Sequence, residues 1–209
     1  AYLALHPERP RRAEELRAAL WPPGPDGSGP EARAETLRSY LSLLRRALGP
    51  DHVPPATGGD YRLDAETVST DWSRFCSLVT TARTADPGAA REDLCAALAL
   101  VRGRPFAGVS SGWAWVAEEH LGSTMEAAIV TAARHLVALS LNFDHDLAAF
   151  AIQRGLAAVP TDEGLHEDRL RLAARAGTGP LDRAWRDTQV VLGADHPFAA
   201  LYRHLRRAP

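Results

Sequence analysis

The sequence predicts a mainly α-helical protein in which a small mixed lobe is followed by an array of helices. Three observations favour this fold class. Apolar residues recur at helical spacing over most of the 209 residues. Residues 1–66 read as helix, loop, helix and hairpin, which is the order of a winged helix-turn-helix. Leucines in the second half recur at an offset of 34 residues, the period of tetratricopeptide helix pairs.

The first elements are short helices. Residues 1–6 (AYLALH) read as the end of a helix, so we interpret the chain as part of a longer protein. Residues 12–20 (RAEELRAAL) predict a second helix with Leu16 and Leu20 facing inward, and Trp21-Pro22-Pro23 ends it. A turn-rich loop follows over residues 24–30 (GPDGSGP).

Residues 31–49 (EARAETLRSYLSLLRRALG) predict one helix with two unlike faces. Its apolar stripe consists of Leu37, Leu41, Leu44 and Leu48, and Gly49 ends it. Five polar residues fall largely outside this stripe and can face water or a phosphate backbone: Arg38, Ser39, Ser42, Arg45 and Arg46. A core helix with a solvated face is the commoner origin of such a pattern; the alternative is a recognition helix that enters the major groove of DNA.

A small β-hairpin is expected after this helix. Short alternating stretches, His52-Val53 and Tyr61-Arg62-Leu63, flank the Gly58-Gly59 turn. In a winged helix this hairpin is the wing, which makes Arg62 the sixth candidate DNA contact. The expected domain boundary follows, with a truncated winged helix at 1–66 and a helical domain at 67–209.

The second part reads as helices throughout, except for an irregular stretch at 103–112. The expected helices cover residues 70–84, 89–102, 113–141, 146–159, 163–176, 180–192 and 197–207. The stretch 113–141 is either one helix or two helices that meet near Gly122-Ser123. The 34-residue offset relates Leu136 to Leu170 and Leu147 to Leu181. Each helix pair has an apolar face that it cannot bury alone, so neighbouring pairs must stack. Asp144-His145-Asp146 reads as a turn between helices that supplies the N-cap of the helix over residues 146–159, and a metal site is the alternative.

Composition bounds the function. All 24 positive side chains are Arg and the formal net charge is −2, which argues mildly against a dedicated DNA-binding protein. We expect no signal peptide and no segment in this chain that spans a membrane. Cys76 and Cys95 lie in apolar helical patterns, which is typical of buried free thiols in a reducing cytoplasm.

No catalytic constellation is visible. The eight histidines form no HExxH pattern and no Cys/His ligand set, so we expect no enzyme activity, no cofactor and no metal site. The densest aromatic patch consists of Phe106, Trp113 and Trp115. We favour a core plug that packs the irregular loop onto the helices; the sharper alternative is a groove for a peptide or a small ligand.

Several stretches resemble a known family. ALHPERPRRAEELRAALWP, ETLRSYLSLLRRALG and GGDYRLD are similar to the winged helix of actinobacterial transcriptional activators of the Streptomyces antibiotic regulatory protein type. DWSRFCSLV, LCAALALVRGRPFAG and WAWVAEE resemble their bacterial transcriptional activator domain, a tetratricopeptide-like array. VRGRPFAGVSSGWAWVA resembles a subgroup of membrane proteins that also carry a LysM domain. The resemblance implies a cytoplasmic protein, or the cytoplasmic part of a membrane-tethered one.

The sequence departs from this family in its expected recognition helix. DNA-binding members tend to read S-R-L-R-R where this chain has Ser42-Leu43-Leu44-Arg45-Arg46, and Tyr40 stands where His is common. Leu43 lies off the apolar stripe, and it cannot donate to a phosphate or a guanine edge. The sheet that usually precedes the first helix is also expected to be absent from this chain.

Two functions follow from these patterns. The first is a non-enzymatic regulatory module of transcriptional-activator type, which recognises a protein or ligand through its helical array and has a weakened DNA contact. The alternative is a sequence-specific DNA-binding transcriptional regulator that uses the 31–49 helix. The expected partners are accordingly duplex DNA, a protein partner or small ligand at the array, and a second copy of the chain in a homodimer.

Overall fold

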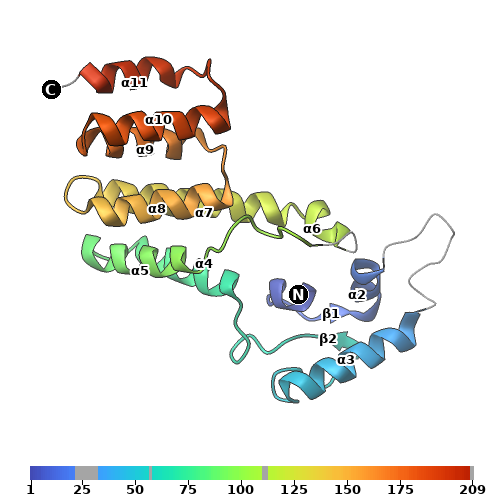
Figure 1. Ribbon diagram of the computed structural model, residues 1–209. Helices are drawn as coiled ribbons and strands as arrows, with labels where there is room; N and C mark the ends of the chain where they lie inside the picture. Colours follow the sequence, from blue (N-terminus) through green and yellow to red (C-terminus); the bar gives the residue numbers. More distant parts are fainter. Residues whose placement is uncertain (22–32, 57, 110–112, 208–209) are drawn as a thin grey trace. The chain divides into compact units, whose positions relative to one another are not determined.

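The computed structural model describes residues 1–21, 33–56, 58–109 and 113–207, and these are mainly helical with one two-stranded sheet (Figure 1). The chain divides into two compact units. The first unit contains Ala1–Arg74 and Gly108–Leu121, and the second contains Phe75–Ala107 and Gly122–Pro209. The chain therefore visits each unit twice, and a single domain boundary at residue 66 stays a prediction.

The described residues of the first unit form short helices and one two-stranded sheet. Its elements are α1 (Tyr2–Leu5), β1 (Arg11–Arg12), α2 (Ala13–Leu20), α3 (Ala34–Leu48), β2 (Asp60–Tyr61) and α6 (Ala114–Glu118). Leu3, Leu16, Leu37 and Leu41 form its buried core. The predicted helices at 1–6, 12–20 and 31–49 are thus present, although residues 31–32 and the predicted loop at 24–30 lie outside the described residues.

The predicted inward faces of α2 and α3 are correct except at their last residues. Leu37 and Leu41 are buried and Leu44 is half-buried, but Leu48 is 43% exposed and Leu20 is 40% exposed. α2 has eight residues and α3 has fifteen, so the surface that α2 offers ends before the last turn of α3. Gly49 ends α3 with φ +100°, a backbone angle that favours glycine, as the sequence predicts.

The predicted hairpin is wrong. β2 pairs antiparallel with β1, Arg11 opposite Tyr61 and Arg12 opposite Asp60, and not with residues 52–53. One backbone hydrogen bond, from the Asp64 N–H to the His52 carbonyl at 3.0 Å, links the first expected arm to the residue that follows the second. Pro54 and Pro55 have no N–H to donate to a ladder, which favours pairing with the distant strand. Gly58 and Gly59 do form the turn, whereas Thr57 lies outside the described residues.

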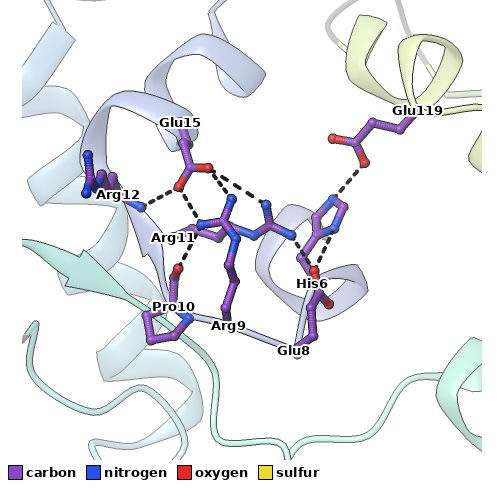
Figure 2. A network of polar contacts seen from close by, with 8 residues as sticks. All are labelled: His6, Glu8, Arg9, Pro10, Arg11, Arg12, Glu15 and Glu119. Atoms are coloured by element: carbon purple, nitrogen blue, oxygen red, sulfur yellow. Dashed lines mark hydrogen bonds and ion pairs between the residues drawn. The ribbon is translucent and has the colours of Figure 1, made fainter.

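A polar network connects the loop before α2 to the segment that follows α6 (Figure 2). The Arg9 guanidinium donates to both carboxylate oxygens of Glu15, at 2.5 and 3.1 Å. The Arg12 backbone N–H donates to Glu15 Oε2 at 2.8 Å. These hydrogen bonds, led by the one from Arg9, lower the pKa of Glu15 to about 2. His6 Nε2 lies 2.9 Å from Glu119 Oε2, so the network bridges two distant parts of the sequence within one unit.

The second unit is a stack of helices. It contains most of α4 (Asp71–Ala82), then α5 (Pro87–Ala99), α7 (Leu121–Ser140), α8 (His145–Ala158), α9 (Glu163–Arg175), α10 (Thr178–Leu192) and α11 (Phe198–Arg207). Figure 1 shows α4 with α5, α7 with α8, α9 with α10, and then α11 as successive layers. α5 packs on α8, α8 on α9, and α11 on both α9 and α10. The predicted helical array is confirmed.

Aspartate caps and a leucine core hold this stack. Asp144 accepts from the Leu147 N–H at 2.9 Å and caps α8, so the N-cap lies in the turn where the sequence predicts one; Asp162 caps α9 in the same way. The core contains Leu94, Leu98, Leu136, Leu165, Leu170 and Leu181, each less than 2% exposed. Of the residues related by the 34-residue offset, Leu136 and Leu170 are equally buried, whereas Leu147 is only half-buried.

Two further features of the second unit bear on its chemistry. Cys76 and Cys95 are free thiols, but they are half-buried and not buried as expected, and burial raises the pKa of Cys76. Phe75 and Leu94, one position earlier in each helix, are buried instead, and one residue along a helix turns a side chain by about 100°. No helix within the described residues is both long and apolar enough to cross a bilayer.

Candidate functional site

The outer face of α3 presents most of the candidate DNA contacts. Arg38, Ser42 and Arg46 are exposed and follow one another at intervals of four residues, so they form a single row along the helix. Ser39 is exposed beside this row, and Arg62 is exposed just after β2. The row offers two guanidinium groups and a hydroxyl, which are groups that can contact a phosphate backbone.

Arg45 differs from the other five candidates because its guanidinium is engaged inside the unit. Nε donates to the carbonyl oxygen of Val53 at 2.9 Å, and Nη2 donates to that of Pro54 at 3.2 Å. Val53 is 1% exposed, so these bonds fasten the end of α3 to a buried segment. Arg45 therefore connects the end of α3 to the segment that follows it through two hydrogen bonds.

Apolar side chains stand beside the exposed row on α3. Leu43, predicted to lie off the apolar stripe, is 55% exposed, and Tyr40 is equally exposed one turn earlier. The Trp21 ring stacks on Tyr40 with their centroids 5.8 Å apart. A leucine and a tyrosine ring bring no positive charge, so this helix offers fewer phosphate contacts than an arginine at position 43 would allow.

The predicted aromatic site is divided between the two units. Trp113 and Trp115 belong to the first unit, where their rings stack with centroids 5.5 Å apart, whereas Phe106 belongs to the second. Trp115 is buried and meets the Tyr2 ring edge-on at 5.0 Å. A cavity of about 310 Å³ lies beside Trp115, with Glu15, Glu118 and Glu119 among its lining. A common site of the three aromatic residues stays a prediction.

A concave groove lies in the second unit, between α8, α9 and α10. This groove encloses about 650 Å³. Its apolar lining comes from all three helices: Ile152 and Leu156 on α8, Leu172 and Ala173 on α9, and Ala184 on α10. Further alanines, Ala149, Ala157 and Ala176, complete it. A mainly apolar concave site of this size is typical of small-molecule binding.

A few polar side chains line the same groove. Arg169 of α9 and Asp187 of α10 form an ion pair across it. Arg183 lies one turn before Asp187 on α10, is exposed, and has no hydrogen bond or ion pair with any described residue. His145 and Gln153 of α8 are the remaining polar lining residues. The groove thus carries one guanidinium whose charge is not matched by an acidic partner.

Sequence reasoning missed this groove. Its lining is drawn from three helices, contains many alanines and includes no recognisable motif, so nothing local marks it. The available signal was the 34-residue period, because stacked helix pairs create concave surfaces. The period indicates stacked helix pairs with a concave surface, but it does not identify the helices or the residues that line the groove.

The described residues contain no group of three or more His, Cys, Asp or Glu side chains that could hold a metal ion. The most deeply buried histidine, His166, is a core residue. Its Nδ1 lies 3.1 Å from Thr188 Oγ1, and its Nε2 lies 2.8 Å from the Pro160 carbonyl oxygen. Burial lowers the pKa of His166 and favours its neutral form.

Comparison with known proteins gives one family match. Residues 70–180, more than half of the chain, match the model of a family described as the bacterial transcriptional activator domain. The matched range contains every lining residue of the α8–α10 groove except Arg183, Ala184 and Asp187. No curated protein sequence matches the chain.

Proposed function

The chain belongs to the bacterial transcriptional activator domain family, and from this membership we propose that it is a non-enzymatic regulatory module that recognises its effector in the α8–α10 groove. The observation that carries the proposal is the groove itself. It is concave, mainly apolar and largely inside the matched range. A regulator needs a site whose occupation can bias the helices around it, and this groove is lined by three helices that pack on one another.

The same proposal includes a weak DNA contact through the first unit. Arg38, Arg46 and Arg62 are exposed and can each neutralise a phosphate. Arg45 donates within the unit, and Leu43 replaces a basic side chain on the outward face. The chain has a net charge of −2 and these three arginines are not clustered. This pattern supports attraction to DNA phosphates regardless of base sequence more than recognition of one base sequence.

The groove is tested with N-phenyl-1-naphthylamine, a neutral apolar dye that fluoresces when it leaves water. We expect saturable binding to the chain, and loss of that binding when Ala149→Phe fills the groove. Ala149 is exposed, so the larger ring enters the groove and not the core. Ala138→Phe is the matched control, because Ala138 is an exposed alanine on α7 outside the groove lining. Equal binding by both variants would contradict the proposal.

The second candidate function is a sequence-specific DNA-binding regulator that uses α3. The exposed row of Arg38, Ser42 and Arg46 favours it. Specific recognition requires side chains that reach base edges, which discriminate by about 1–3 kcal/mol per good bidentate pair. Tight binding to one duplex sequence and weak binding to scrambled duplexes would select this function over the first.

The finer features of the family resemblance extend the proposal. We infer a winged-helix origin for residues 1–66, supported by the order of α2, α3 and β2 and by the basic face of α3. Residues 101–117 support membership of the actinobacterial LysM-containing subgroup, in which the parent protein would hold this chain on the cytoplasmic side of a membrane. A homodimer is the further proposed assembly, and sedimentation of the chain over a range of concentrations tests it.

A further inference from the structure

We propose that the ligand of the α8–α10 groove is a small amphiphilic organic anion, whose apolar body fills the groove and whose single anionic group is held by Arg183. This inference rests on the proposed function, because it names the chemistry of the ligand that the groove recognises. The anionic group can be a carboxylate, a sulfonate or a phosphate, since each offers oxygen acceptors to a guanidinium.

The walls of the groove define the body of the ligand. Ile152, Leu156 and Leu172 provide large apolar surfaces, and the alanines between them leave the space open. The enclosed volume of about 650 Å³ falls within the range of small-molecule sites. An extended peptide would place its N–H and C=O groups against walls that offer few hydrogen-bond partners, which is costly. A compact apolar molecule has no backbone N–H or C=O groups that need hydrogen-bond partners in the groove.

The rim of the groove defines the charge of the ligand. Three charged side chains line it, and two of them, Arg169 and Asp187, neutralise each other in an ion pair. Arg183 remains, with no hydrogen bond or ion pair to any residue that the structure describes. An anion bound there would gain a charge-assisted hydrogen bond in a partly apolar setting, whereas a cation would meet an unmatched guanidinium.

Arg183 is also suited to the geometry of such a group. A guanidinium presents its N–H donors in a planar fork that matches two oxygens of a carboxylate, sulfonate or phosphate. Asp187, four residues further along α10, is already paired with Arg169 and so does not compete for Arg183. The apolar walls and the free guanidinium lie on the same groove, which places both parts of an amphiphile within reach.

Two dyes with the same aromatic body test the inference. 1-Anilinonaphthalene-8-sulfonate carries one sulfonate, and N-phenyl-1-naphthylamine lacks it. We expect the sulfonate dye to bind with one-to-one saturation and at least about tenfold more tightly, since a hydrogen bond to a charged group has that order of effect. Arg183→Gln should remove this advantage and leave the neutral dye within about twofold of its original affinity. Circular dichroism and thermal unfolding establish that each variant is folded.

Arg186→Gln is the matched control, because Arg186 is exposed on the same helix but does not line the groove. It should change the affinity for neither dye. If both dyes bind equally and Arg183→Gln has no effect, the anion inference is overturned while the groove remains a binding site. If neither dye binds, or if Ala149→Phe leaves the binding of both intact, the proposed function fails together with the inference.

Discussion

Arg45 Nε lies 2.9 Å from the carbonyl oxygen of Val53 and donates a hydrogen bond to it. Its neighbour Arg46 is exposed on the outer face of α3. Two adjacent arginines therefore have different functions: Arg45 stabilises the first unit, and Arg46 is available to a partner. Any test of DNA binding that changes both residues together would confuse a loss of contact with a loss of stability.

Arg45→Gln should lower the free energy of unfolding by about 1.5–3 kcal/mol, because hydrogen bonds from a charged donor contribute on that order. Arg46→Gln should change it by less than about 0.5 kcal/mol, as is usual for a surface substitution. Urea denaturation followed by circular dichroism measures both. Equal effects of the two substitutions would show that the hydrogen bonds of Arg45 do not stabilise the first unit.

Gly155→Ala should destabilise the helical array by about 1–3 kcal/mol, as overpacking does. A Cβ at Gly155 would overlap Leu165 Cδ1 and lie 3.0 Å from the Ala133 Cβ, and Leu165 is fully buried. Alanine favours a helix over glycine by only about 0.5–1 kcal/mol, which does not offset the overlap.

Gly179→Ala is the matched control for this prediction. Gly179 lies in α10, and a Cβ there would meet nothing within 4 Å. Gly179 precedes Pro180, which disfavours helical backbone at a residue that carries a Cβ and so opposes the gain in helix propensity. This substitution should therefore change stability by less than about 1 kcal/mol. A stabilising effect of Gly155→Ala in the same urea experiment would refute the close packing of α7, α8 and α9 at this point.

Glu15 should make stability depend on acid pH. Its pKa is about 2 in the folded chain, against an ordinary value of 4.5. Above pH 4.5 the carboxylate is ionised in both states and its contribution is complete. As the pH falls from 4.5 toward about 2, the unfolded chain binds the proton first, so stability decreases.

The thermal midpoint measured between pH 6 and pH 2 tests this linkage. The difference between the wild-type chain and Glu15→Gln should be largest above pH 4.5 and should nearly vanish by about pH 2. A difference that stays constant over the whole range would mean that the Arg9–Glu15 contact does not control it.

DNA binding should be weak, independent of sequence and steeply dependent on salt. At physiological salt we expect a Kd of about 10⁻⁴–10⁻⁶ M or weaker for random duplex DNA, measured by fluorescence anisotropy. Replacing Arg38 and Arg46 by Gln should reduce the salt slope by about 2, one for each lost phosphate contact. Arg203→Gln, an exposed change on α11, should leave the slope unchanged. Nanomolar binding to one sequence would instead favour the alternative function.

The helices could be predicted because their signals are local. Leu37 and Leu41 recur at helical spacing and are buried, Gly49 ends α3, and Asp144 caps α8. Each of these signals depends on residues within about one turn. The residue at which the buried face of a helix ends is harder to predict. The exposure of Leu48, for example, depends on how far the neighbouring helix extends.

The sheet and the groove depend on distant parts of the chain. Tyr61 pairs with Arg11, fifty residues away, and a search for short hairpins cannot find that partner. The role of Arg45 depends on the carbonyl groups that lie against it, which helical periodicity does not reveal. Leu156, Leu172 and Arg183 meet at one groove only because three helices stack, so their common site becomes visible only in the folded chain.

The central claim is that this chain recognises its effector in the α8–α10 groove. A titration of the ¹⁵N-labelled chain with 1-anilinonaphthalene-8-sulfonate, followed by two-dimensional amide NMR, tests it most directly. We expect saturable shifts centred on Ile152, Leu156, Leu172 and Arg183, with the amides of α3 unchanged. Shifts centred on α3, or distributed evenly over both units, would contradict it.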